Sequence, residues 1–302
     1  MRRTSSIVFV VALALVIASS SARPADRPAT LGVYGGLGSW LDIFAGRVWW
    51  EPNTVVAALR AHGVGTLYLQ TSNYSQRADV VRPAAVAGLI DAAHAAGIDV
   101  VGWYLPSFTN QAVDARRSLA AMRFRTPSGQ HYDSFALDIE ATLVRNVSPR
   151  NARLLALSRL IRSSSPVGYP LGAIIPSPVG MRHHPHYWPS FPYAELAQSF
   201  DAILPMAYFT HYTRSPNGAY AYAHDVVTAI RARTGRPNEI IHLIGGLASG
   251  APPAAFAAFD QAASDCGVDG LSFYEFPLTT ASEWSLLSET PLGQTVQPSC
   301  AG

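Results

Sequence analysis

Residues 99–140 contain the pattern that decides the fold: DVVGWYLP at 99–106, ARRSLAAMRF at 115–124 and SFALDIE at 134–140. The first and last of these runs are short and apolar, which is typical of buried strands. The middle run repeats apolar residues at steps of three and four, which indicates an amphipathic helix. These residues therefore predict a strand–helix–strand unit.

Similar apolar runs recur along the chain every 29 to 39 residues. Their centres are Val33, Leu69, Gly102, Leu137, Ile174, Pro205, Ile244 and Phe273. Helical patterns lie between them at 53–63, 83–97, 115–124, 151–165, 221–235 and 252–267, and several end at a glycine suited to a helix C-cap. Eight strands that alternate with helices in about 250 residues predict an α/β protein built as a single (β/α)8 TIM barrel.

A doubly wound open sheet is the alternative fold. The sequence favours it less, because GVYGGLGSW at 32–40 lacks the G-x-G-x-x-G spacing of a phosphate loop after a first strand. Of the 302 residues, 49% are apolar and 14% are charged, and the net charge is +2. This composition excludes a disordered tail protein and a nucleic-acid binder that depends on bulk charge.

The N-terminus has the order of a secretory signal: Arg2 and Arg3, an apolar run at 7–18, and small residues up to Ala22. An uncleaved N-terminal anchor is the alternative, and the arginine pair is also a weak match to a twin-arginine signal. We expect a secreted protein that is monomeric and does not contact a membrane in its mature form. The expected segments are a signal peptide at 1–22, a linker at 23–30, the barrel at 31–290 and a tail at 291–302.

Two cysteines, Cys266 and Cys300, occur in the sequence. In an exported protein, a pair of cysteines is most simply one disulfide. That disulfide would tie the C-terminal tail to the barrel.

Two acidic residues end the fourth predicted strand, in YDSFALDIE at 132–140. Alternation places Phe135 on the helix-facing side and Asp138 and Glu140 together in the barrel mouth. Two carboxylates in a partly dry site raise the proton affinity of one of them, as a general acid for glycosidic bond cleavage requires. The alternative is that both side chains bind backbone amides or arginine and only complete the strand.

The segment DSFALDIE resembles the fourth-strand D-x-x-D-x-D-x-E signature of the family-18, chitinase-type glycoside hydrolases. Asp133, Asp138 and Glu140 take three of the four acidic positions, and Ala136 takes the other. This resemblance implies that Glu140 is the acid/base that protonates the leaving sugar. It implies that Asp138 orients the N-acetyl group of the substrate, which attacks the anomeric carbon.

Other strands carry further parts of the resemblance. AILPMAYF at 202–209 is similar to the family's M-x-Y-D element, which implies that Tyr208 helps to hold the acetamido group beside Met206. Tyr34 and Trp40 in the first run are candidate sugar-facing aromatics. Phe209 replaces an expected Asp, VVGWYLPSF at 100–108 lacks the S-x-G-G element, and the eighth run has Tyr274 where the family has Trp. A D-x-E pair at a strand end also resembles the family-25 lysozymes.

Further binding residues are expected on the strands and in the loops that follow them. The predicted set is Gln70, Trp103, Tyr104, Asp133, His211, Tyr274, Glu275 and Trp188, with Asp42, Tyr187 and Tyr212 as additional hydrogen-bonding or stacking candidates. Glu275 is also the distant carboxylate that a two-carboxylate mechanism could use, although it shares the strand face of the helix-facing Leu271 and Phe273. A carboxylate pair on strands four and seven is disfavoured, because IIHLIGGLA at 240–248 contains none.

The loop after the fifth strand contains His183, His184 and His186. H-H-x-H without a nearby carboxylate gives little support to a metal site, so we expect no metal and no cofactor. Three functions stay open: a polysaccharide hydrolase that uses Glu140 and Asp138, an inactive carbohydrate-binding barrel, and a two-carboxylate or metal-assisted hydrolase of another family. The expected partner is a polysaccharide, not a nucleic acid.

Overall fold

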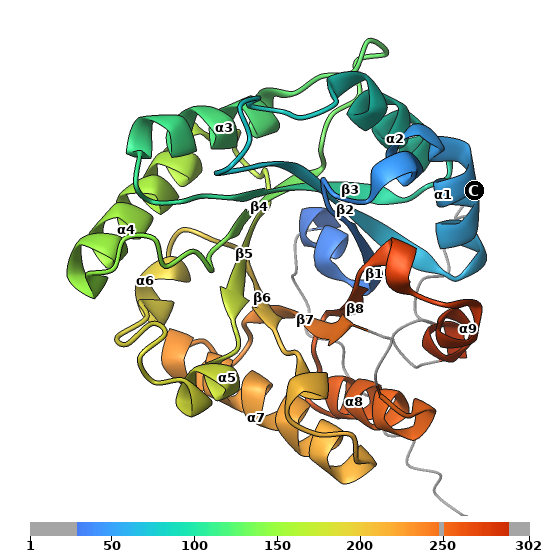
Figure 1. Ribbon diagram of the computed structural model, residues 1–302, viewed down its shortest axis with the longest axis vertical. Coiled ribbons are helices and arrows are strands. Elements are labelled where there is room, and N and C mark those ends of the chain that lie inside the picture. The colour runs from blue at the N-terminus through green and yellow to red at the C-terminus, as the bar shows by residue number, and fades with distance from the viewer. Residues whose placement is uncertain (1–28, 248–250, 290–302) are drawn as a thin grey trace, which may run out of the picture.

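The computed structural model describes residues 29–247 and 251–289. Eight parallel strands close into a barrel in sequence order, and helices surround it (Figure 1). The predicted (β/α)8 barrel is therefore confirmed. The strands are β1 (Gly36–Leu41), β2 (Val64–Asn73), β3 (Asp99–Leu105), β4 (Ser134–Asp138), β5 (Leu171–Pro176), β6 (Ala202–Met206), β7 (Ile240–Leu247) and β8 (Gly270–Tyr274).

Helices α1, α2, α3, α4, α7 and α8 lie on the predicted amphipathic patterns, whereas α9 and the two short helices between β5 and β6, α5 and α6, were not predicted. The α-helices are α1 (Pro52–Ala61), α2 (Pro83–Ala95), α3 (Gln111–Arg123), α4 (Val147–Ser164), α5 (Pro178–His183), α6 (Tyr193–Leu196), α7 (Pro216–Thr234), α8 (Pro253–Asp265) and α9 (Ala281–Glu289). The 3₁₀ helices are η1 (Ala29–Tyr34), η2 (Gly46–Trp50), η3 (Phe209–His211) and η4 (Phe276–Leu278).

The first strand begins later than the sequence predicted. The run centred on Val33 forms η1, and β1 starts at Gly36, whose φ of 66° is a left-handed conformation that glycine adopts without steric cost. This turn leaves Tyr34 before the strand, at the N-terminal end of the barrel.

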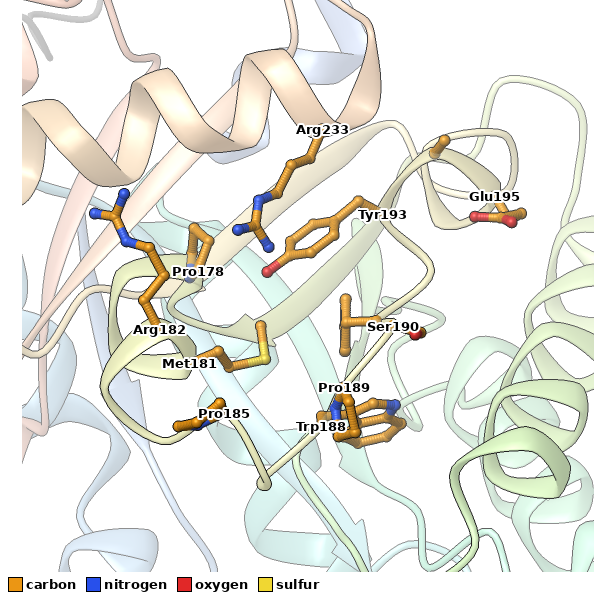
Figure 2. A pocket seen from close by; sticks show the side chains of 12 residues that line it. Pro178, Met181, Arg182, Pro185, Trp188, Pro189, Ser190, Tyr193, Glu195 and Arg233 are labelled. Atoms are coloured by element: carbon orange, nitrogen blue, oxygen red, sulfur yellow. The ribbon is translucent and has the colours of Figure 1, made fainter.

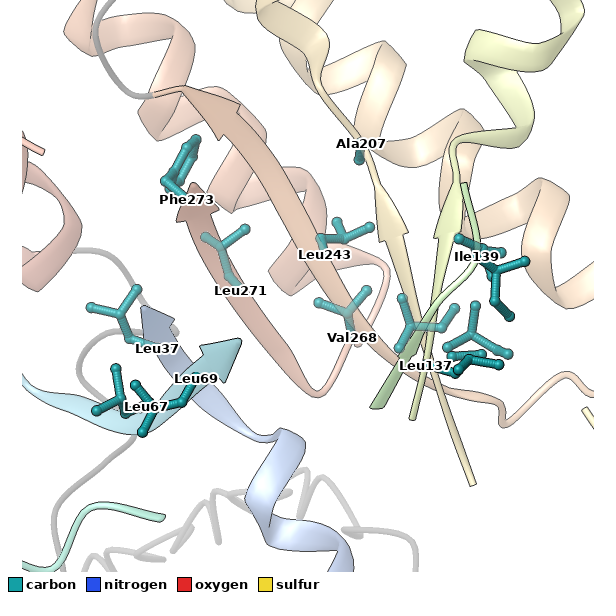
Figure 3. Close-up of a cluster of buried hydrophobic side chains, with 14 of the residues drawn as sticks. Leu37, Leu67, Leu69, Leu137, Ile139, Ala207, Leu243, Val268, Leu271 and Phe273 are labelled. Atoms are coloured by element: carbon teal, nitrogen blue, oxygen red, sulfur yellow. The ribbon is translucent and has the colours of Figure 1, made fainter. Parts of the chain in front are cut away.

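Apolar side chains pack in two places: between the strands and the outer helices, and inside the barrel. Figure 3 shows Leu137 and Ile139 in the outer layer, which they share with Phe135. Ala136 belongs instead to the cluster inside the barrel. The alternation predicted along β4 is therefore confirmed, and it directs Asp138 to the inside. Truncation of a fully buried side chain such as Leu137 to Ala costs about 2–5 kcal/mol.

The N-terminal part of the barrel interior is closed by a buried hydrogen-bonded chain. Burial lowers the pKa of His242 to about 4, so the imidazole is neutral. Its Nδ1 lies 3.0 Å from the Tyr34 carbonyl oxygen, which fixes the proton on Nδ1. Its Nε2 accepts from Ser272 Oγ at 2.9 Å, and Ser272 Oγ accepts from Trp40 Nε1 at 2.7 Å. The Tyr34 hydroxyl bonds Ser134 Oγ.

The predicted signal peptide, most of the linker and the C-terminal tail lie outside the described residues. The predicted Cys266–Cys300 disulfide also lies outside them, because Cys300 belongs to the tail. Within residues 29–247 and 251–289, no helix combines the length and the apolar character needed to cross a membrane.

Candidate active site

A cavity of about 360 Å³ opens at the C-terminal end of the barrel, where active sites of this fold lie. Its walls come from all eight strands or the residues that follow them. They comprise Trp40, Asp42, Phe44, Gln70, Asn73, Trp103, Leu105, Asp138, Glu140, Ile174, Met206, Tyr208, His211, Ile244 and Tyr274. The structure therefore brings nine of the predicted site residues together around one space.

The carboxyl groups of Asp138 and Glu140 lie in this cavity, at the last residue of β4 and two residues beyond it. Asp138 is 6% exposed, and its Oδ1 is buried without a hydrogen-bond partner among the described residues. Burial raises the pKa of Asp138 well above its ordinary value, and the charge of Glu140 adds to the rise. Burial also raises the pKa of Glu140. The pair therefore retains a proton at pH values where ordinary carboxyl groups are ionised.

Tyr208 lies beside this pair, directly after β6. Burial raises the pKa of its hydroxyl, and negative charge on Asp138 and Glu140 raises it further. The phenol is therefore protonated throughout the physiological pH range and can donate a hydrogen bond into the cavity. The structure places Tyr208 in the cavity with the two carboxyl groups, and the role that the sixth-strand motif implied for it stays a prediction.

Two indoles form the opposite wall and floor. The ring of Trp40 stacks on Tyr68 with centroids 4.1 Å apart and meets the edge of Trp103 at 5.8 Å. Because one face of Trp40 is covered and its Nε1 is bonded to Ser272, its orientation is fixed. Trp103 is 5% exposed, and its Nε1 is buried without a partner among the described residues. The cavity thus holds an unpaired donor as well as an unpaired acceptor.

Asp42 is a third carboxylate in the cavity, at the end of β1. It accepts a hydrogen bond from the Tyr274 hydroxyl at Oδ2 (2.6 Å) and from the Phe44 backbone N–H at Oδ1 (2.7 Å). Gln70 Oε1 accepts from the Ile43 backbone N–H at 3.0 Å. These bonds hold the β1 loop against the mouth of the barrel.

A second cavity, of about 340 Å³, adjoins the first on the side of α5 and η3. Glu140, Met206, Tyr208 and His211 line both spaces. The second space also has the partly exposed rings of Tyr187 and Tyr212 in its wall. The Tyr187 hydroxyl donates to the backbone oxygen of Glu140, which fixes the segment that carries the carboxyl group.

Comparison with known proteins adds evidence at the level of the fold. No protein-family model and no curated protein matches the sequence. Solved structures do match. The C-terminal domain of a putative chitinase from Desulfitobacterium hafniense has a TM-score of 0.64 at 12% identity, covering 84% of this chain and 98% of that one. The likeness is one of fold.

Two further structures illustrate the range of similar barrels. A family-18 N-acetylglucosaminidase from Paenibacillus barengoltzii matches with a TM-score of 0.59 at 9% identity, covering 84% of this chain and 98% of that one. An endo-1,4-β-mannanase from Rhizomucor miehei matches at 0.62 and 10% identity, covering 80% and 86%. The chain therefore shares its fold with TIM-barrel glycoside hydrolases, including those of the family that the fourth strand resembles.

Five predicted site residues lie outside the two cavities, and three of them are explained by strand geometry. Tyr34 is fully buried at the N-terminal end of the barrel interior. Asp133 precedes β4, where its Oδ2 accepts from the Val100 N–H (2.7 Å) and contacts His94 Nε2 (2.8 Å). Tyr104 follows the inward-facing Trp103, so it points outward and donates to Asp114 at 2.7 Å. The structure therefore does not bring these three residues into either cavity.

The other two residues are held beside the site. Glu275 is 8% exposed and does not line either cavity, although its Oε2 lies 3.4 Å from the Asp42 backbone nitrogen. Trp188 is 2% exposed, because Arg150 covers its ring at 4.1 Å and Phe108 and Phe191 pack on its edges. The Trp188 ring is therefore almost wholly covered by protein side chains and does not line either of the two cavities beside Glu140.

Several lining residues were not in the predicted set: Asn73, Phe44, Leu105, Ile174 and Ile244. Asn73 and Leu105 end the long β2 and β3, so their place at the C-terminal end of a strand was the signal that could have found them. The histidine loop divides between two roles: His184 lines the second cavity, and His183 stacks on Tyr212 at 4.9 Å. Within the described residues, no group of three or more His, Cys, Asp or Glu side chains could hold a metal ion.

Proposed function

We propose that this protein is a glycoside hydrolase that cleaves a polysaccharide containing N-acetylated amino sugars. The observation that carries the proposal is the Asp138–Glu140 pair: two carboxyl groups with raised pKa values in a cavity walled by aromatic rings, with an Asp138 oxygen left unpaired. Perturbed carboxyl groups that converge in a cleft are characteristic of catalytic sites.

In the first step, protonated Glu140 donates its proton to the glycosidic oxygen, and the bond from that oxygen to the anomeric carbon breaks. The acetamido carbonyl oxygen of the substrate forms the new bond to the anomeric carbon. Asp138 accepts the acetamido N–H at its unpaired Oδ1, which orients this internal nucleophile. The Tyr208 hydroxyl donates a hydrogen bond to the acetamido group from the other side.

In the second step, the Glu140 carboxylate removes a proton from water, and the oxygen of that water bonds to the anomeric carbon. The bond to the acetamido oxygen breaks, and the amide is restored. Glu140 ends protonated, as it began. No enzyme nucleophile and no cofactor enters this scheme.

The two adjoining cavities define the orientation in which the sugar chain binds. The cavity with Asp138, Trp40 and Trp103 takes the sugar whose anomeric carbon reacts, because it holds the group that orients the acetamido chain. Glu140 lies in the wall common to both cavities, so the leaving sugar occupies the second one, against Tyr187 and Tyr212. A general acid must lie beside the bond that it protonates.

The cavity supports substrate assistance better than a pair of catalytic carboxylates on strands four and seven. The contribution of β7 to the lining is Ile244. Asp42 is the remaining carboxylate in the wall, and it is engaged by Tyr274 and the Phe44 N–H. We therefore assign Asp42 to substrate binding. We also propose, from the arginine pair and apolar run at the N-terminus, that the protein is exported.

The test is hydrolysis of matched N-acetylated and deacetylated oligosaccharides of glucosamine by the mature protein, with Glu140→Gln and Asp42→Asn as variants. We expect reducing ends to be released from the acetylated oligomers alone. Glu140→Gln is expected to abolish release, and Asp42→Asn to reduce it about tenfold or less, as loss of a binding contact does.

Other outcomes separate the remaining functions. Equal cleavage of both oligomers, abolished by Asp42→Asn, would indicate a two-carboxylate mechanism. Equal binding of the oligomers by wild type and Glu140→Gln without any hydrolysis would indicate a carbohydrate-binding barrel. Loss of hydrolysis on treatment with a chelator would indicate a metal-assisted enzyme.

A further inference from the structure

A third cavity lies on the outer side of α5, away from Glu140. It measures about 560 Å³ and is enclosed by α5, the loop that follows it, α6 and the end of α7. Figure 2 shows its lining side chains, with Arg182 and Glu195 on opposite sides. We name it the α5–α7 cavity. Cavities of this size accommodate small organic ligands.

The floor and one wall of the α5–α7 cavity are apolar. They are formed by Pro178, Met181, Pro185, Trp188, Pro189 and Phe191. Trp188 is fixed there by the hydrogen bond from its Nε1 to Asn151 Oδ1 (2.7 Å) and by Arg150 over its ring. Rigid apolar and aromatic surfaces of this kind pack against the C–H faces of sugar rings.

The charged residues that line the α5–α7 cavity are Arg182, Arg233 and Glu195, and Glu195 is exposed and lies on the side opposite Arg182. Arg182 is paired with Asp225 at 3.2 Å, so its charge is compensated. Arg233 lies over the ring of Tyr193 at 5.0 Å and has no carboxylate partner among the described residues. Its guanidinium therefore brings uncompensated positive charge to the cavity, where it can bind an anion with two parallel hydrogen bonds.

Tyr193 supplies the second sign of a ligand site. Its side chain is 6% exposed, and the polar group that faces its buried hydroxyl is the Arg233 guanidinium, which can donate to the hydroxyl oxygen but cannot accept its hydrogen. Figure 2 shows this hydroxyl directed into the α5–α7 cavity, next to the Arg233 guanidinium. Arg233 is an exposed, flexible side chain, so a small shift of it opens the hydroxyl to a ligand. The hydroxyl hydrogen lacks an acceptor, and a bound anion would supply one.

We propose that the α5–α7 cavity is a second binding site, which takes a sugar that carries a carboxylate. The carboxylate binds the Arg233 guanidinium and the Tyr193 hydroxyl, and the sugar ring packs on the apolar floor. The carboxylate requirement follows from the cavity, and the choice of a sugar as its carrier rests on the proposed function. The carboxylate can belong to the ring of a uronic acid or to an ether substituent of an amino sugar.

The α5–α7 cavity is close to the leaving-group side of the active site. Met181 of α5 lines both this cavity and the one beside Glu140. A bound acidic sugar therefore lies one short helix away from the sugars undergoing cleavage. The site would hold an acidic polysaccharide near the catalytic cleft without taking part in the reaction.

The test is a ligand-observed NMR titration of the mature protein with glucuronic acid, N-acetylmuramic acid and neutral N-acetylglucosamine. The variants are Arg233→Gln and Tyr193→Phe. Arg123→Gln is the matched control, because Arg123 is also an exposed arginine in the last turn of a barrel helix. Because the readout is binding, it stays interpretable if the protein hydrolyses no substrate.

We expect at least one acid to bind about tenfold more tightly than the neutral sugar, as a charge-assisted pair provides. Arg233→Gln should abolish this preference, Tyr193→Phe should reduce it a few-fold, and Arg123→Gln should leave it intact. Binding of a single acid would support the site and identify the position of its carboxylate. Equal affinities for acids and neutral sugar, or equal losses in Arg233→Gln and Arg123→Gln, would overturn the proposal.

Discussion

The two ends of the barrel interior differ in how their buried polar groups are hydrogen-bonded. Toward the N-terminal end, His242 and Ser272 form a hydrogen-bonded chain that reaches the Nε1 of Trp40 in the cavity wall, and the Tyr34 hydroxyl bonds Ser134. At the C-terminal end, an oxygen of Asp138 and the Trp103 Nε1 are buried without partners among the described residues. The chain through His242 is complete, whereas the hydroxyl of Tyr68, whose ring centroid lies 5.1 Å from that of His242, is buried without a partner among the described residues.

This difference distinguishes polar groups that stabilise the fold from polar groups that are available to bind a substrate. An unpaired buried donor or acceptor costs about 1–3 kcal/mol, so a fold retains one where something else is gained. Satisfied groups at the N-terminal end indicate a role in stability. Unsatisfied groups around the cavity indicate a role in binding, because a substrate supplies the missing partners. Substitutions at the two ends should therefore change different properties.

The largest expected effect is on catalysis, at the C-terminal end. Glu140→Gln should lower kcat by about 10²–10⁴-fold, because removal of a general acid costs that much, while Tm stays within about 2 °C of wild type. In wild type, activity should fall as pH rises through the pKa of Glu140, which burial places above the ordinary carboxyl range. Steady-state kinetics between pH 4 and 9 and a thermal melt check both statements. Unfolding of the variant at low temperature would contradict the division between the two ends.

The next effect is on stability, at the N-terminal end. Tyr34→Ala removes a fully buried aromatic ring and leaves Ser134 without its tyrosine partner, so unfolding should become easier by about 3–5 kcal/mol. The kcat of the folded fraction should stay within about twofold of wild type. Chemical denaturation followed by tryptophan fluorescence measures the first value, and active-site-normalised kinetics measures the second. Loss of kcat in fully folded Tyr34→Ala would show that this end also serves catalysis.

The sequence predicted the barrel and the residues at the end of β4, because both depend on local periodicity. Phe135, Leu137, Asp138 and Glu140 alternate between the two faces with a period of two, and this needs no knowledge of the other strands. The same alternation of side chains applies to the two neighbouring aromatic residues of β3. Trp103 and Tyr104 are neighbours on β3, so a single one of them can face the interior.

For Asp133 and Tyr34, the end of the strand at which the residue lies decides whether it can reach the cavity. Asp133 and Asp138 lie five residues apart, which separates them by about 16 Å along an extended strand. The resemblance to the family signature predicts both residues in one site, but the structure places them at opposite ends of β4. Tyr34 was assigned to the first strand because LGVYGG is apolar, whereas the turn at Gly36 places it before that strand. Trp188 is covered by Arg150, a contact between distant segments that periodicity does not predict.

A smaller effect concerns acid stability at the N-terminal end. His242 has a native pKa of about 4 and an ordinary value of 6.5, so between these values the unfolded chain binds a proton that the native state does not. Stability therefore falls as pH drops through this range, by about 3 kcal/mol in total. His242→Gln should remove this part of the pH dependence. Because Glu239 and Glu275 have pKa values of about 7 and contribute the opposite slope, the relevant measurement is the difference between variant and wild type in denaturation at pH 4.5 and 7.

The smallest expected effect is a rise in Tm on substitution of Asp138, and it tests the difference between the two ends of the barrel most directly. Because burial raises the native pKa of Asp138, the folded protein binds its proton more tightly than the unfolded chain, and stability falls as pH rises above the ordinary carboxyl value. Asp138→Asn keeps the shape and removes the charge, so Tm at pH 7 should rise by about 2–4 °C while hydrolysis is lost. Asp114→Asn is the matched control, since Asp114 is also a buried carboxyl group with a raised pKa but accepts bonds from Tyr104 and Phe108. In differential scanning calorimetry, the control substitution Asp114→Asn should lower Tm. A fall in Tm for Asp138→Asn as well would mean that Asp138 is satisfied in the folded protein and serves the barrel rather than a substrate.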